Sequence, residues 1–253
     1  MSLLQPYINR QFNGAIWRLE IDELSDTIFI EIRNDAEKQV SFSSIDLATG
    51  KTNFDGLTTP ERWLTGIEAA YDGVLLLHNY QSANGPAHKG LIAIDATSGE
   101  TLWSNYIYAF DHLTISGPVL YDTNFHPKKL FLADIKTGDT SRIYQPFIYP
   151  ELQNNIIAPQ AINPESLPAG LFPMPPYGNS VHYLEYNNFR IVSLHTLQGG
   201  LLKQYLFVMD GVEKVYEHLL NADIQKLQPE AFILHKNRLI YIKNKTFLNV
   251  ISL

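Results

Sequence analysis

One stretch of the sequence, Gly90–Trp103, limits what this chain can fold into more than any other. An almost wholly apolar run before Asp95 predicts a short strand that is buried on both faces. Asp95 can accept hydrogen bonds from the backbone N–H groups that follow it, and Gly99 can supply the positive φ of a tight turn. The run that ends at Trp103 predicts the return strand, with a large side chain placed to pack on a neighbour. The stretch is therefore a hairpin unit.

Weaker copies of this unit recur along the chain. Each has an Asp before a Gly-containing turn, and two copies place an aromatic residue at the same interval after the Asp. The expected turn and docking residues are Asp46, Gly50 and Phe54, then Asp95, Gly99 and Trp103, then Asp134 and Gly138. A fourth copy spans Phe207–Tyr216, and Phe247–Leu253 matches the first half of the unit. Short-strand repeats with a period of roughly 40–50 residues indicate propeller blades.

The segment Ala93–Trp103 resembles the repeat of the pyrroloquinoline-quinone-type, or quinoprotein-like, β-propellers, and Asp46–Phe54 resembles it less closely. The resemblance implies a propeller in which the aromatic residue docks between adjacent blades. Quinone-dependent dehydrogenases of this type are much longer and carry an adjacent cysteine pair, whereas this chain has no cysteine. We therefore expect the fold and no cofactor. The chain also resembles uncharacterised propeller-like domains of unknown function from Bacteroidetes.

The strand units predict an all-β fold of five blades, in a single domain over residues 1–253. The last unit lacks its return strand, so we expect a strand within Tyr7–Glu20 to complete it and to leave no exposed sheet edge. Trp17 resembles the Trp103 position and is expected in that strand. Six blades or an irregular sandwich are the alternatives. The segment Glu213–Leu227 fits a helix as well as a strand.

The strand rhythm stops between Gln145 and Ser180, where most of the prolines lie. A segment of this length without a strand pattern is uncommon in a compact domain and is usually functional or disordered. Its aromatic and aliphatic residues argue against disorder, so we expect an insertion that lies on the scaffold. Phe172, Met174 and Tyr177, beside stiff prolines, suit a protein-contact surface or a lid. A strap over one apolar face is the alternative.

Composition excludes several classes of function. A formal net charge of −7 without a Lys/Arg cluster argues against nucleic acid as a partner. The first residues lack the basic start and apolar run of a secretory signal, and no apolar stretch is long enough to span a bilayer. The absence of cysteine excludes disulfides, thiolate chemistry and Cys-ligated metals. These features predict a cytoplasmic protein without a membrane span.

No catalytic signature is present: there is no Gly-rich phosphate loop, no His-Glu-x-x-His, no Gly-x-Ser-x-Gly and no calcium-loop spacing. Turn capping explains the repeated Asp residues better than paired catalytic carboxylates do. None of the eight histidines pairs at metal-ligand spacing within one element, so we expect no catalytic residue and no metal site. Strand ends of several blades can converge at one face, which makes His78, Asp111 and His112 candidate ligand-binding residues. Hydrogen-bonded or exposed histidines are the alternative.

Three functions follow as hypotheses. The leading one is a non-enzymatic propeller that binds a partner protein of unknown identity or a small molecule, with the insertion contributing to the contact. The second is a carbohydrate-active hydrolase with carboxylates around the propeller axis, by analogy with other five-bladed propellers. Its candidate carboxylates are Glu68, Asp111, Asp122 and Glu185. The third is a small-molecule or metal sensor, which would require His78, Asp111 and His112 to converge.

Overall fold

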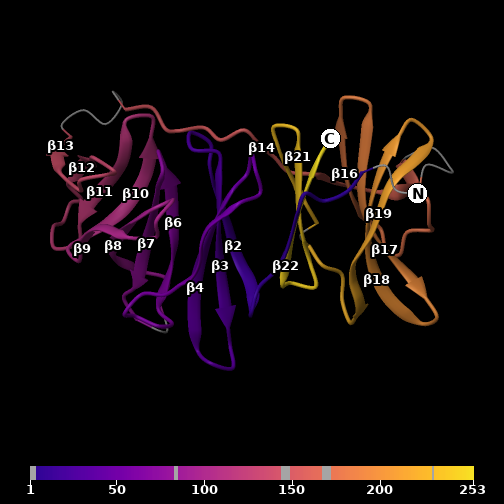
Figure 1. Ribbon diagram of the computed structural model, residues 1–253, viewed down its shortest axis with the longest axis horizontal. Coiled ribbons are helices and arrows are strands. Elements are labelled where there is room, and N and C mark those ends of the chain that lie inside the picture. Colours follow the sequence, from indigo (N-terminus) through magenta and orange to yellow (C-terminus); the bar gives the residue numbers. More distant parts are fainter. Residues whose placement is uncertain (1–3, 83–84, 144–148, 167–171, 230) are drawn as a thin grey trace. The chain divides into compact units, whose positions relative to one another are not determined.

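The structure, a computed structural model, describes residues 4–82, 85–143, 149–166, 172–229 and 231–253. Over these residues the fold is all-β, with five antiparallel sheets and no α-helix (Figure 1). These sheets are the blades of a β-propeller, and their number fits the five predicted blades. No helix in the described part of the chain has the length and apolar character that crossing a bilayer would require.

The chain divides into two compact units, which we describe separately. The central unit comprises residues 13–154, and the terminal unit comprises residues 1–12 together with 155–253. The single domain expected over residues 1–253 stays a prediction.

The central unit holds three sheets, each a meander of four strands. The first sheet consists of β2 (Ala15–Asp22), β3 (Thr27–Asn34), β4 (Gln39–Asp46) and β5 (Thr52–Leu57). The second consists of β6 (Thr65–Tyr71), β7 (Val74–Tyr80), β8 (His88–Asp95) and β9 (Thr101–Asn105). The third consists of β10 (Tyr108–Thr114), β11 (Gly117–Asp122), β12 (Leu130–Ala133) and β13 (Thr140–Arg142).

The terminal unit holds two sheets of five strands each. The fourth sheet runs in the order β15 (Gln160–Ile162), β16 (Val181–Tyr186), β17 (Phe189–Gln198), β18 (Leu201–Asp210) and β19 (Glu213–Ile224). The fifth sheet runs in the order β1 (Ile8–Gln11), β22 (Phe247–Ser252), β21 (Arg238–Lys243), β20 (Ile233–His235) and β14 (Ile156–Ile157). The segment that fitted a helix and a strand equally well is thus the strand β19.

The strand β1 completes the last sheet, as predicted for the region Tyr7–Glu20. It pairs antiparallel with β22, where Ile8 lies opposite Val250. The assignment of Trp17 to that strand is wrong. Trp17 lies in β2 of the first sheet and is 67% exposed. A break in the β2–β3 register leaves it without a cross-strand partner, and the guanidinium of Arg33 lies 5.3 Å from the centroid of its ring.

The insertion contains short strands, so the expectation of no strand in this segment is also wrong. Glu151 bridges to Thr114, the last residue of β10, in the central unit. In the terminal unit, β14 and β15 each extend an edge of a sheet. A 3-10 turn, η2 (Pro164–Ser166), follows β15. β14 and β15 have two and three residues, and each is defined by its hydrogen bonds to the neighbouring strand. Segments this short show no alternation of apolar and polar residues, so the sequence pattern could not reveal them. Residues 145–148 and 167–171 of the insertion lie outside the described residues.

The repeated turns share one geometry. Asp95 Oδ1 accepts hydrogen bonds from the N–H groups of Thr97 (2.9 Å) and Ser98 (2.7 Å), and Gly99 has a φ of 75°. The side chains of Asp46 and Asp134 accept N–H bonds in the same way, and the glycines that follow also have positive φ, namely Gly50 and Gly138. The sequence signature therefore corresponds to an Asp-capped turn closed by a left-handed glycine.

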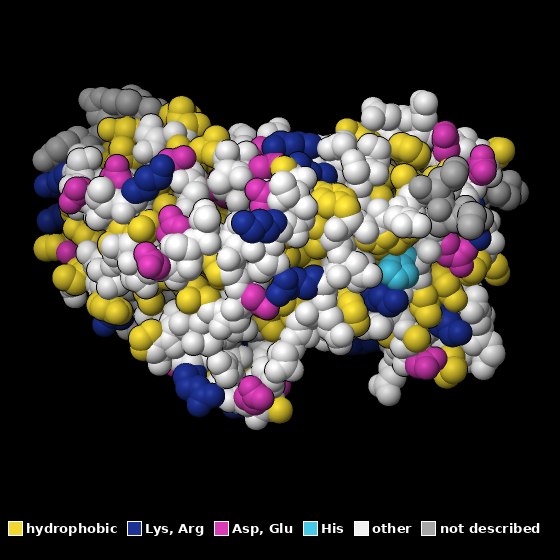
Figure 2. All heavy atoms as spheres, in the orientation of Figure 1, with side chains coloured by type: hydrophobic (Ala, Val, Ile, Leu, Met, Phe, Trp, Pro, Cys, Tyr) yellow, Lys and Arg dark blue, Asp and Glu magenta, His cyan; other side chains and the backbone are white. Residues whose placement is uncertain are grey.

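The core lies between facing sheets within each unit. Phe29 and Phe42 of the first sheet pack against Ile67, Leu75 and Leu77 of the second, and all are fully buried. A corresponding cluster fills the space between the fourth and fifth sheets. On the face shown in Figure 2, basic and acidic side chains are interspersed over the described residues.

Candidate functional site

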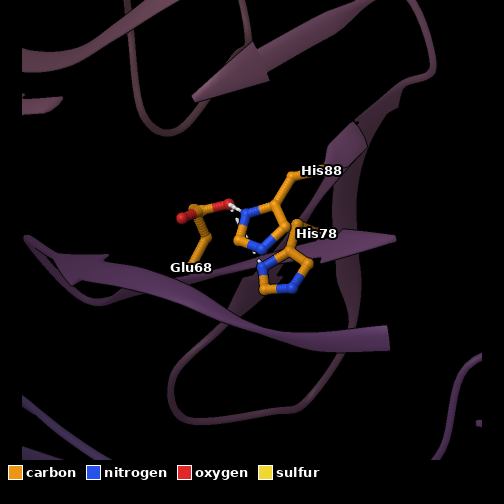
Figure 3. A group of neighbouring side chains, drawn as sticks. All are labelled: Glu68, His78 and His88. Atoms are coloured by element: carbon orange, nitrogen blue, oxygen red, sulfur yellow. Dashed lines mark hydrogen bonds and ion pairs between the residues drawn. The ribbon is translucent and has the colours of Figure 1, made fainter. Parts of the chain in front are cut away.

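Three polar side chains meet in the second sheet of the central unit. Glu68 comes from β6, His78 from β7 and His88 from β8 (Figure 3). Nδ1 of His88 lies 2.8 Å from Glu68 Oε2, and Nδ1 of His78 lies 3.1 Å from the same oxygen. The two imidazoles are stacked, with ring centroids 3.5 Å apart and planes within 7°. One potential ligand atom of each residue lies within 4.8 Å of the other two.

Two β-bulges place these side chains. Ile67 pairs with Leu77 and Ala69 pairs with Leu76, so Glu68 is an extra residue with no partner opposite it. On the other side of β7, Gly90 is left out of the register and has a φ of 77°. Bulges bend a strand and re-aim side chains, and they are common beside functional sites. The cluster therefore depends on two local departures from strand alternation.

The bulge on the first strand recurs in all three sheets of the central unit. The unpaired residues are Trp17 in β2, Glu68 in β6 and Asp111 in β10. In the third sheet, Asp111 contacts His112 at 2.9 Å and Lys128 at 3.2 Å. Asp111 and His112 thus lie beside each other, and they are not members of the group that contains His78.

His78 is the unusual member of the cluster. It is 2% exposed, and neither ring nitrogen has a hydrogen-bond partner among the described residues. Its Nδ1 is close to Glu68 but is not aligned with it as a hydrogen bond requires. An unsatisfied buried polar group costs about 1–3 kcal/mol and calls for an explanation such as a bound ion. The side chain of His88 is 32% exposed, so the cluster reaches the surface.

The surroundings shift the pKa values of two carboxyl groups in opposite directions. Burial alone would raise the pKa of Glu68, but the contacts and charges of His78 and His88 outweigh it and leave the pKa lowered. Burial raises the pKa of Glu20, against the opposing effect of Arg18, and the negative charge of Glu68 raises it further. Glu68 is therefore held as a carboxylate, which is the form that binds a cation.

The three groups suit a divalent transition metal. Imidazole nitrogen and carboxylate oxygen are the donors of many zinc, copper, iron and nickel sites. Zinc bonds of about 2.0–2.1 Å in a tetrahedron place neighbouring ligand atoms about 3.3 Å apart. The observed distances of 2.8 and 3.1 Å from Glu68 Oε2 to the two nitrogens are shorter than that spacing, and the two imidazole planes are nearly parallel. Binding of one ion by both rings therefore requires the imidazoles to turn so that each lone pair points at it. Three protein ligands leave a fourth position open.

Sequence reasoning singled out His78 but expected no metal site, and it missed His88. Glu68 was named only as a candidate axial carboxylate. The missing information is the register: His88 lies opposite Tyr80, two residues beyond His78, and the Gly90 bulge shifts the pairing between them. No spacing within one element reveals three residues on three strands.

The predicted contact residues of the insertion fall into two groups. Phe172 and Met174 are partly buried against the fourth sheet, on a cluster that includes Val181 and Phe207. Tyr177 is 47% exposed, and its N–H donates to the carbonyl oxygen of His195 at 2.7 Å. The first two residues therefore anchor the segment, while the third presents its ring to solvent.

A second polar cluster lies in the terminal unit between β19 and β21. Tyr241 Oη is 2.6 Å from Tyr216 Oη and 2.7 Å from His218 Nδ1, and Lys243 Nζ is 3.0 Å from His218 Nε2. These groups bond one another, so the cluster is internally satisfied. The His78 cluster differs because, within the described part of the chain, neither ring nitrogen of His78 has a hydrogen-bond partner.

The sequence comparisons bear on the same region. Residues 21–103 match the model of a domain of unknown function (DUF4905), which covers less than half of the chain. The matched segment contains Glu68, His78 and His88. No curated protein matches the chain.

Several solved propellers resemble the chain at low identity. The β-propeller domain of the trilobed protease from Pyrococcus furiosus is 9% identical over 93% of this chain, with a TM-score of 0.35. This chain spans 64% of that one. The endo-arabinase from Bacteroides thetaiotaomicron is 12% identical to this chain, with a TM-score of 0.29. The match covers 100% of this chain and 97% of the endo-arabinase. BamB from Moraxella catarrhalis is 9% identical to this chain, with a TM-score of 0.23. The match covers 99% of this chain and 100% of BamB.

Proposed function

We propose that the protein is a non-enzymatic, ligand-binding β-propeller whose site is a divalent transition-metal centre formed by Glu68, His78 and His88. The observation that carries the proposal is the buried imidazole of His78, which has no hydrogen-bond partner among the described residues and stacks on a second imidazole beside a carboxylate. A bound metal ion would satisfy Nδ1 of both histidines and the oxygen that they share.

The open fourth position gives the centre a binding role. His88 lies at the solvent side, so a ligand with an oxygen or nitrogen donor could reach the ion there without displacing a protein group. Exposed Tyr177 in the insertion supports the separate expectation that this segment contributes to a protein contact.

Metal titration of the purified protein tests the proposal. We expect one equivalent of Zn²⁺ or Co²⁺ to bind to the wild type, and binding to be lost in His88→Ala. His112→Ala is the matched control, because His112 is a partly exposed histidine that also contacts a carboxylate in the same unit. Metal at a hundred times its dissociation constant should add about 2.7 kcal/mol to the free energy of unfolding. Absence of saturable binding, or equal binding by His88→Ala, would refute the metal centre.

One observation favours the hydrolase as a second candidate. Glu20 and Glu68 both accept hydrogen bonds from Arg18, Glu20 through its carboxylate and Glu68 through its carbonyl oxygen, and the negative charge of Glu68 raises the pKa of Glu20. Two neighbouring carboxyl groups are what glycoside hydrolysis requires. The other candidate carboxylates are likewise bound by local partners: Asp111 contacts His112, Asp122 accepts an N–H bond from Asn124, and Glu185 accepts a bond from Tyr183. Hydrolysis of aryl glycosides by the wild type, lost in both Glu20→Gln and Glu68→Gln, would establish this candidate. No turnover of any such glycoside would exclude it.

A further inference from the structure

The backbone around Glu68 is held by side chains of a different sheet. Glu31 Oε2, on β3, accepts a hydrogen bond from Ile67 N at 2.9 Å. Arg18, on β2, donates through Nη1 to Ile67 O at 2.8 Å and through Nη2 to Glu68 O at 2.9 Å. Three backbone groups at the bulge are therefore satisfied by two side chains of the first sheet.

Both side chains are themselves fixed by opposite charges. Arg18 Nη2 donates to Glu20 Oε2 at 2.9 Å. Glu31 is 2% exposed and accepts a bond from Arg33 Nε at 2.8 Å, and Arg33 also donates to Thr65 O at 3.1 Å. The planar guanidinium of Arg18 can bridge two carbonyl oxygens, which the single ammonium group of a lysine cannot do with the same geometry.

We propose that Arg18 and Glu31 are positioning residues of the metal centre. A bulged residue has no cross-strand partner to fix it, so its direction depends on what holds the backbone on either side. Arg18 and Glu31 supply that restraint from the first sheet and keep the Glu68 carboxylate on the two imidazoles of the second. This inference rests on the proposed function, because it concerns the affinity and geometry of the same site.

A purely structural role for these contacts would only join the two sheets. It predicts lower stability for a variant but an unchanged site in the molecules that remain folded. A positioning role predicts weaker metal binding and altered coordination in the folded protein. Residues that orient metal ligands typically change metal affinity 10–100-fold when they are replaced.

The experiment is a Co²⁺ titration followed by visible absorption, with Zn²⁺ competition, at a temperature where each variant is folded. Arg18→Met keeps much of the side-chain volume and removes the donors. We expect it to bind Co²⁺ at least about 10-fold more weakly than the wild type, with changed d–d band intensities. The Co²⁺ affinity of Arg18→Lys should lie between those of the wild type and Arg18→Met, since lysine restores one hydrogen-bond donor. Arg62→Met is the control and should match the wild type, because Arg62 is exposed and, among the described residues, its side chain donates only to Gln39, at 3.5 Å.

The outcomes separate the two proposals. If the wild type binds Co²⁺ and folded Arg18→Met binds it with the same affinity and spectrum, the positioning role is overturned while the metal centre stands. If the wild type binds no metal, the metal centre fails and the positioning role fails with it. If Arg18→Met does not fold, Arg18→Lys decides: wild-type affinity and spectrum in that variant overturn the positioning role.

Discussion

The indole ring of Trp103 lies so close to Gly138 that a Cβ atom at Gly138 would be 2.7 Å from its Cδ2. Trp103 Nε1 also donates to Ile135 O at 2.8 Å, so the indole is bonded to the third sheet as well as packed on it. Phe54 and Gly99 repeat the relationship between the first and second sheets, with a Cβ contact of 3.2 Å to the ring. The turn glycine is therefore required both by its φ and by the aromatic ring of the preceding sheet.

Gly138→Ala should destabilise the protein more than Gly73→Ala does. Both glycines have a φ near +80°, which costs an L-residue about 1–2 kcal/mol, but a Cβ at Gly73 would meet nothing within 4 Å. The difference between the two variants in urea unfolding isolates the clash with Trp103. Equal losses of stability would show that the indole moves aside without cost.

Trp103→Ala should lower the free energy of unfolding by about 3 kcal/mol, because the indole contributes to two hydrophobic clusters between the second and third sheets. Leu102→Ala is the control, since Leu102 is adjacent and exposed. Its expected cost is below about 0.5 kcal/mol. Similar values for the two variants in chemical unfolding would contradict the docking role.

Gly66→Ala tests the packing around the metal centre. A Cβ at Gly66 would lie 3.1 Å from His78 Nε2 and 3.2 Å from Glu31 Oε2, which is tighter than ordinary contact. His78 and Glu31 are both buried, so we expect the added methyl group to displace the His78 imidazole. Zn²⁺ affinity should then fall about 10-fold, as it does when other groups that orient a metal ligand are changed. Isothermal titration at equal folded fractions measures this. Unchanged affinity would show that His78 has room to move.

Phe172→Ala and Tyr177→Ala should separate anchoring from contact in the insertion. Phe172 packs against the core of the fourth sheet, so its truncation should cost about 1–3 kcal/mol. Tyr177→Ala should change stability by less than about 0.5 kcal/mol. Thermal and urea unfolding of both variants measure the difference. A large loss in Tyr177→Ala alone would reverse the assignment.

His195 should make stability depend on pH. Burial lowers its pKa to about 4 from 6.5, with a smaller contribution from His182, and its Nε2 accepts a bond from Gln228 N at 3.0 Å. Between pH 6.5 and pH 4 the unfolded chain therefore binds a proton that the folded chain does not. The contribution of neutral His195 to the free energy of unfolding is therefore present in full above pH 6.5 and is lost as the pH falls towards 4.

We expect the loss at His195 to be on the order of 1 kcal/mol at pH 5 relative to pH 7. His195→Gln keeps an acceptor but does not titrate, so its stability should fall less over the same range. Parallel urea unfolding curves at the two pH values measure the effect. Identical pH dependence in both proteins would mean that His195 is protonated without cost.

The fold could be predicted from the sequence where one local rule determines the structure. The Asp-x-x-x-Gly turns at Asp95 and Asp134 and the aromatic residue at Trp103 depend on residues a few positions apart. Trp17 misled the assignment, because a Trp near an Ala-Ile run resembles the docking position, while the bulge at which it lies leaves no sequence signal. The register break at Glu68 is equally hidden.

The candidate site was only partly predictable for the same reason. His78 lies in an apolar strand and attracts notice, whereas His88 is the first residue of β8 and its position opposite Tyr80 is a property of the pairing. Arg18 contacts the backbone of Glu68, 50 residues further along the chain, and Glu31 contacts the backbone of Ile67, 36 residues further along. No local pattern encodes contacts at that separation.

The pairing of β1 with β22 also determines the order in which the chain can complete its structure. Residues 8–11 are synthesised before residues 247–252, and their ladder can form only once both segments have been made. Every pairing of the central unit, by contrast, lies within residues 13–154 and is available while the rest of the chain is still being made. Glu68, His78 and His88 can therefore come together during translation, and the fifth sheet closes only after synthesis has reached β22.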